Sequence, residues 1–134
     1  MPAKALVPPG SETAARALSL SPGVLSQGHV FVTGMTGSDP SGAMPADPET
    51  QFRNAFDKIA AVLAEAGLGM GDIVEMTSYH IDIRKHFDLF AAVRRDYVQP
   101  PFPAWTAVEA GGLRREGALV EIRVIAAMRD KTTC

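Results

Sequence analysis

Apolar residues recur every three to four positions in one long stretch of the chain, which is the period of an amphipathic helix. The apolar positions of this stretch are Phe52, Ala55, Phe56, Ile59, Val62, Leu63 and Ala66. Asp47 suits the N-cap, Pro48 suits the first helical position, and Gly67 suits the left-handed residue that ends a helix. The pattern therefore predicts a helix between Asp47 and Gly67.

A second helical period covers Arg84 to Val98, and the Pro100-Pro101 pair prevents its continuation. The remaining apolar residues lie in short runs rich in β-branched side chains, which predict strands. We expect a hairpin or meander over Ala17 to Met35, and a loop over residues 37–47. Further strands are predicted over Ile73 to Ile81, Trp105 to Val108 and Leu119 to Met128. The last two are joined by a Gly-rich turn, which predicts a closing hairpin.

The order of these elements is β-β-α-β-α-β-β. It predicts an α+β fold, a two-layer sandwich of one mixed β-sheet with two helices on one face. Residues 2–16 contain three prolines, a glycine and scattered charges, so we expect a loosely ordered N-terminal segment over residues 1–16. Residues 17–130 are expected to form a single domain, because no repeat and no second boundary interrupts them.

The final predicted strand has two different faces, because successive side chains of a strand point to opposite sides. One face carries Val120, Ile122, Val124, Ala126 and Met128, which suits packing under the helices. The other face carries Leu119, Glu121, Arg123 and Ile125. Large aliphatic residues beside charged ones favour packing of this second face against other subunits, so we expect an oligomer.

Composition and charge limit the kinds of partner and location that we expect for the protein. The formal net charge is -2 and the sequence pI is about 5.9, which counts against a nucleic-acid partner, since such partners bind clustered Lys and Arg. No apolar run approaches the roughly 20 residues that span a membrane, and Cys134 is the only cysteine. We therefore expect a cytoplasmic protein. Metal-ligand spacing is lacking among His29, His80 and His86.

Several short motifs occur in an order that resembles one known family. They are Val30-Phe31-Val32-Thr33-Gly34, Ala64-Glu65-Ala66-Gly67 with Asp72-Ile73-Val74, Pro103-Ala104, and Val120-Glu121-Ile122. From about Ser19 to Met128 the chain resembles the RidA family, also called YjgF or UK114 and often described as endoribonuclease L-PSP. The resemblance implies a homotrimer with a barrel-like centre and small-molecule clefts between subunits. It also implies hydrolysis of enamines or imines to 2-keto acids and ammonia, without a metal or organic cofactor.

The resemblance also implies which residues form the site. Glu121 falls on the family's glutamate and Thr33 on its usual serine, so both are candidate catalytic residues. Trp105 falls on the arginine that holds the substrate carboxylate, Ala107 on a frequent cysteine, and Ala91 on a frequent asparagine. An indole has one N–H donor and no charge, and a charge-assisted hydrogen bond contributes roughly 1.5–3 kcal/mol. We therefore expect weak activity on the usual 2-imino acids.

Three alternatives could compensate for the missing arginine. The favoured one is a planar or apolar ligand that stacks on Trp105. The second is a cation from Arg123, and the least favoured is Arg114 or Arg115, because arginines in turns are usually solvated. Structural roles are also open: Trp105 could fill a gap between subunits, and Glu121 could pair with Arg123. The pair Arg94-Arg95 is interpreted as a solvated helix face.

Three functions remain open from the sequence. The first is a deaminase-type hydrolase of unknown substrate that acts on a small imine, enamine or related metabolite. The alternative is a non-catalytic small-molecule binding or regulatory module on the same trimer. RNA cleavage, suggested by the family description, is disfavoured by the acidic pI and by the absence of a basic stripe.

Overall fold

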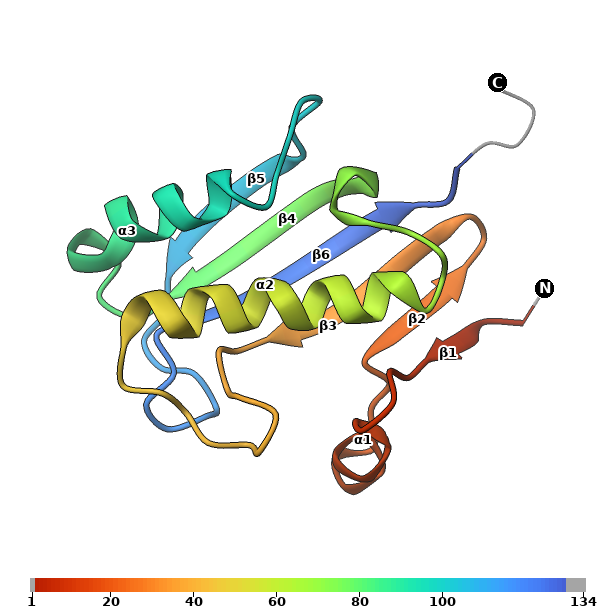
Figure 1. The fold of residues 1–134 in the computed structure, drawn as a ribbon, viewed down its shortest axis with the longest axis horizontal. Helices are drawn as coiled ribbons and strands as arrows, with labels where there is room; N and C mark the ends of the chain where they lie inside the picture. The colour runs from red at the N-terminus through yellow and green to blue at the C-terminus, as the bar shows by residue number, and fades with distance from the viewer. Residues whose placement is uncertain (1, 130–134) are drawn as a thin grey trace.

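The computed structural model describes residues 2–129. Six strands form one mixed sheet in the order β1-β2-β3-β6-β4-β5, and helices α2 and α3 lie across one face of it (Figure 1). The elements are β1 (Lys4–Leu6), α1 (Glu12–Leu18), β2 (Gly23–Ser26), β3 (His29–Met35), α2 (Pro48–Ala64), a 3-10 turn (Met70–Asp72), β4 (Ile73–His80), α3 (Ile83–Arg95), β5 (Ala104–Glu109) and β6 (Val120–Ala127). The predicted α+β sandwich is confirmed.

Helix α2 begins and ends as its sequence predicts. The Asp47 carboxylate accepts a hydrogen bond from the backbone N–H of Thr50 at 2.9 Å, which satisfies one of the free donors of the first turn. Pro48 is the first helical residue, and Gly67 has a left-handed φ of +73°. The hairpin of β2 and β3 is also confirmed, with Gln27 and Gly28 at positive φ in its two-residue turn.

The N-terminal segment differs from the expectation. Residues 2–16 are not loosely ordered, because β1 pairs antiparallel with β2 and α1 follows it. Leu6 is 2% exposed and packs into the core. This buried side chain and the backbone hydrogen bonds to β2 hold β1 in place. With three residues, β1 is too short to show the alternation of apolar and polar residues that predicts a strand. The predicted hairpin accordingly starts at Gly23, and Ala17 belongs to α1.

The last two strands do not form a hairpin. Strand β4 lies between them: it pairs parallel with β5 and antiparallel with β6. Helix α3 makes the crossover that a parallel pair requires. The prediction was wrong because residues 110–119, which join β5 to β6, are more numerous than the roughly 2–5 residues of a hairpin loop. They can therefore carry the chain past β4.

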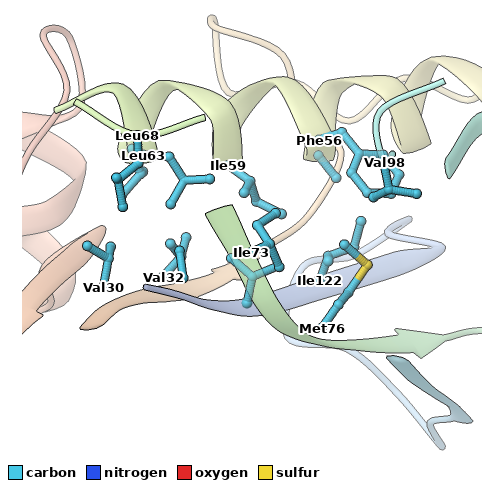
Figure 2. Close-up of a cluster of buried hydrophobic side chains, with 14 of the residues drawn as sticks. Val30, Val32, Phe56, Ile59, Leu63, Leu68, Ile73, Met76, Val98 and Ile122 are labelled. Atoms are coloured by element: carbon cyan, nitrogen blue, oxygen red, sulfur yellow. The ribbon is translucent and has the colours of Figure 1, made fainter. Parts of the chain in front are cut away.

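The core lies between α2 and the sheet (Figure 2). Phe56, Ile59 and Leu63 point from α2 toward the sheet, where they meet Val32 and Ile122. Burial of each such side chain contributes roughly 1.5–3 kcal/mol. The inward face predicted for the last strand is confirmed for its residues 120, 122, 124 and 126, which are at most 1% exposed.

The opposite face of the sheet is called the open face here. Its residues include Phe31, Tyr79, Val108, Glu121, Arg123 and Ile125, which the strand registers place on one side. Phe31 is 40% exposed and Val108 is 38% exposed. The open face is therefore partly apolar in the single chain.

Candidate functional site

A cavity of about 390 Å³ contains both predicted catalytic residues. We call it the Glu121 cavity. Its walls come from α1 and the segment after it, β3 and its end, α2, the 110–119 connection and β6. The lining residues that carry its chemistry are Thr33, Ser38, Lys58, Arg114, Arg115 and Glu121. Three cations therefore share the cavity with one carboxylate, and an anionic ligand would complement them.

The side chains of Thr33 and Glu121 each lie against the backbone of another residue. The Thr33 hydroxyl donates to the carbonyl of Ser21 at 2.6 Å, so toward a ligand its oxygen can only accept. The Glu121 carboxylate lies against Gly34, and a Cβ at that position would collide with it. Glu121 and Arg123 form no ion pair with each other in the described structure of residues 2–129. Arg123 is exposed on the open face and does not line the cavity.

Lys58 brings an amine into the cavity from the middle of α2. Its Nζ donates to the hydroxyl of Ser38 at 2.9 Å. Burial, together with the positive charge of Arg115, lowers the pKa of Lys58 to about 8, and Asp39 acts in the opposite direction. Arg115 is itself anchored by a hydrogen bond to the carbonyl of Gly42 at 2.7 Å. The turn arginines, the least favoured source of a cation in the sequence, thus line the same cavity as Glu121.

Trp105 lies elsewhere, at the corner between α3 and β5. Its ring stacks on Phe87, with centroids 5.6 Å apart and planes 4° apart. The guanidinium carbon of Arg94 lies 3.9 Å from the indole centroid, well within the roughly 6 Å of a cation–π contact. Arg94 is only 9% exposed and its Nε is buried without a partner in the described chain. The interpretation of Arg94 as solvated was wrong, because it continues the apolar stripe of Phe87 and Phe90.

A buried polar chain leads inward from Trp105. The indole N–H donates to the Ser78 hydroxyl at 2.9 Å, and that oxygen lies 2.8 Å from Nε2 of His80. The Ser78 hydroxyl donates to Nε2 in one tautomer of His80 and accepts from it in the other, while Nδ1 is buried without a partner in the described chain. Ser78 and His80 are fully buried. Burial, aided by the nearby His86, lowers the pKa of His80 to about 4, so the ring is neutral near pH 7.

The register shows that Trp105 and Glu121 face opposite sides of the sheet. Trp105 and Val124 are both partners of Met76, so these three share the helix-covered side. Glu121 lies three residues before Val124 and therefore points to the open face. Ala107 is on the side of Trp105, as the partner of Ser78, and Ala91 lies on α3. A single chain thus brings Thr33 and Glu121 together and holds Trp105 apart.

Sequence reasoning missed Lys58, Arg94 and the Ser78–His80 pair. Their spacing carried a signal: Ser78 and His80 follow Met76 at the two-residue period of a buried strand face, and Arg94 follows Phe90 at a helical interval. The described part of the chain contains no cluster of three or more His, Cys, Asp or Glu side chains that could hold a metal ion. No helix within residues 2–129 is long and apolar enough to cross a membrane.

Comparisons with known proteins agree with this architecture. The family model described as endoribonuclease L-PSP matches residues 11–128. The RutC family protein YjgH of Escherichia coli K12 is 38% identical over 103 residues, which cover 76% of this chain and 77% of that protein. The 2-iminobutanoate/2-iminopropanoate deaminase of the same organism is 30% identical over 108 residues, covering 79% and 80%. The solved structure of protein YjgH superposes with a TM-score of 0.85 at 34% identity, covering 96% of this chain and 98% of that one. The chain therefore belongs to the RidA family, also called the YjgF family.

Proposed function

We propose that this protein is a deaminase-type hydrolase of small imines or enamines, and that it works as a homotrimer with sites between subunits. One observation carries the proposal: Thr33 and Glu121 share a cavity with three cations, while Trp105 lies on the other side of the sheet. The sheet separates these two groups within one chain, and a site between subunits would let both contribute to it. A relative named 2-iminobutanoate/2-iminopropanoate deaminase supports the reaction class.

The open face supports the oligomer. Phe31 and Val108 are 40% and 38% exposed, and the half-buried Tyr79 and Ile125 belong to the same face. They form two apolar pairs, Phe31 with Ile125 and Tyr79 with Val108, and exposed apolar surface of this kind favours an interaction site. Packing of three open faces around an axis would cover these residues and would bring the Glu121 cavity near another subunit.

The chemistry asked of the cavity is modest. Water adds to the carbon of a C=N bond, and the products are a carbonyl compound and ammonia. The Glu121 carboxylate can accept a proton from the attacking water, a role that contributes typically 10²- to 10⁴-fold in rate. Arg114 and Arg115 can hold a substrate carboxylate, since a guanidinium binds it with two parallel hydrogen bonds. The two arginines thus supply the positive charge for a substrate carboxylate that Trp105 lacks.

Ammonia release from imines generated in solution tests the proposal. Glu121→Gln removes the base but keeps the size of the side chain, so we expect kcat/KM to fall by about 100-fold or more. Glu65→Gln, on an exposed residue at the end of α2, is the matched control and should leave the rate unchanged. Equal rates for Glu121→Gln and the unchanged protein would refute the catalytic role.

The alternative is a non-catalytic binding module. It is favoured by the Trp105 ring, which already fills the corner between Phe87 and Arg94 where the family pattern has an arginine. A thermal-shift titration with small carboxylic acids and their imines separates the two functions. A saturable rise in Tm without ammonia release supports binding alone, whereas turnover supports the hydrolase.

A further inference from the structure

Lys58 occupies an unusual place for a lysine. It lines the Glu121 cavity and also a second cavity of about 450 Å³ bounded by Pro9, Met35 and Asn54. Ser38 lines both cavities too, and its hydroxyl accepts the hydrogen bond from Lys58 Nζ. The two other lysines in the described chain, Lys4 and Lys85, are exposed. The Lys58 amine is therefore the one that a small molecule in either cavity would meet.

The surroundings of this amine raise the share of its neutral form above that of an ordinary lysine. No carboxylate of residues 2–129 forms an ion pair with Lys58. Its partner, Ser38, is an uncharged hydroxyl, and Arg115 lies close enough to disfavour a second positive charge. With the pKa of Lys58 at about 8, roughly one tenth of the amine is neutral at pH 7, against about one part in several thousand for an ordinary lysine.

Burial beside another cation is the arrangement that activates a lysine as a nucleophile toward carbonyl compounds. We propose that Lys58 is a covalent catalytic residue, whose Nζ forms a Schiff base with small 2-oxo acids and their imines in the Glu121 cavity. The inference rests on the proposed function, because it assigns the substrate to the same cavity. The acid group of such a molecule fits Arg114 and Arg115, which line the cavity with Lys58.

The step balances without any oxidant or reductant. The Nζ lone pair attacks the C=N carbon of the imine, and a new C–N bond forms. The former imine nitrogen takes up the two protons that Nζ loses and leaves as ammonia, so R₂C=NH and the amine give R₂C=N–Lys58 and NH₃. Water then adds to the lysyl imine and releases the ketone and the free amine. Glu121 can accept the proton of that water, and Ser38 can relay a proton to Nζ.

The test traps the Schiff base by reduction. The full-length protein is incubated with pyruvate and treated with sodium borohydride, and the adduct is located by peptide mass mapping. We expect one adduct per chain, on Lys58, and a yield that rises as the pH is raised through about 8. The charged groups around the amine in this titration are Asp39, Asp57, Arg114, Arg115 and Glu121. An adduct spread evenly over Lys4, Lys58 and Lys85 would overturn the proposal.

Two variants sharpen the result. Lys58→Arg keeps the positive charge but removes the nucleophile, so the adduct should fall by about tenfold or more, while Lys85→Arg should retain the full yield. Mapping in the unchanged protein decides the question even if Lys58→Arg folds poorly. An adduct on Lys58 without ammonia release from imines refutes both the hydrolase and the catalytic role of Lys58. Ammonia release that persists in folded Lys58→Arg, with no adduct in either protein, refutes the inference and leaves the hydrolase standing.

Discussion

His80 makes the stability of this protein sensitive to acid, and the effect has a calculable size. Burial holds the pKa of His80 in the folded protein at about 4, against 6.5 for an ordinary histidine. As the pH falls below 6.5, the unfolded chain therefore binds a proton that the folded protein excludes. Stability is complete above about pH 6.5 and is lost progressively down to about pH 4, by about 3 kcal/mol in all.

His80→Gln removes this titration and leaves an amide that can still bond to Ser78. Urea unfolding of both proteins, at about pH 7 and about pH 4.5, measures the difference. The unchanged protein should lose about 2 kcal/mol more than the variant between these two conditions. Acidic groups with lowered pKa values, such as Asp72, destabilise both proteins equally and cancel.

His29→Gln is the matched control, because His29 is exposed at the start of β3. It should retain the full acid sensitivity of the unchanged protein. The reasoning is refuted if His80→Gln loses as much stability on acidification as the unchanged protein does. It is also refuted if NMR titration of His80 gives a pKa near 6.5 in the folded protein.

Three further substitutions, the first with a control, test the packing, the site and the assembly. Trp105→Ala should lower the free energy of unfolding by about 3 kcal/mol in urea titrations, and Phe102→Ala, at a residue 65% exposed, by less than about 0.5 kcal/mol; equal losses would contradict the packing role. Gly34→Ala should lower imine turnover by about tenfold or more with little loss of Tm, because the added methyl displaces the Glu121 carboxylate; unchanged turnover would disprove that contact's importance. Phe31→Asp places a charge on the open face, and light scattering should show a monomer for the variant and the proposed trimer for the unchanged protein; a trimer in both would disprove that interface.

The ends of α2 could be predicted from the sequence because short-range interactions determine them. Its cap, its proline and its terminal glycine act within one turn of the residues they affect, so the sequence alone locates both ends. The strand β1 was not predictable in this way, because it is held by β2 and by one buried leucine. The closing strands were misassigned for a related reason: neighbours in sequence need not pair, and only the whole sheet decides that β4 lies between them.

The site was predictable in part. The cavity brings together Thr33 and Glu121, the two candidate catalytic residues that the family resemblance implied. The separation of Trp105 from Glu121 depends on the register of β5 against β4, and the mixed small and large residues of β5 give no clear alternation from which to derive it. Lys58 was missed because a charged residue beside an apolar stripe usually points into solvent. Its burial depends on Ser38 and on the 110–119 connection, which are remote in sequence.

The central position of β6 in the sheet affects how the chain folds during its synthesis. Strands β1, β2 and β3 form one part of the sheet, β4 and β5 form another, and β6 joins the two parts. Residues 120–127 come after all the other strands, so a ribosome releases them last. Until then the nascent chain exposes two unpaired strand edges, at β3 and β4, which are the kind of surface on which chains aggregate. Truncation before Val120 would leave two sheet fragments with no strand between them.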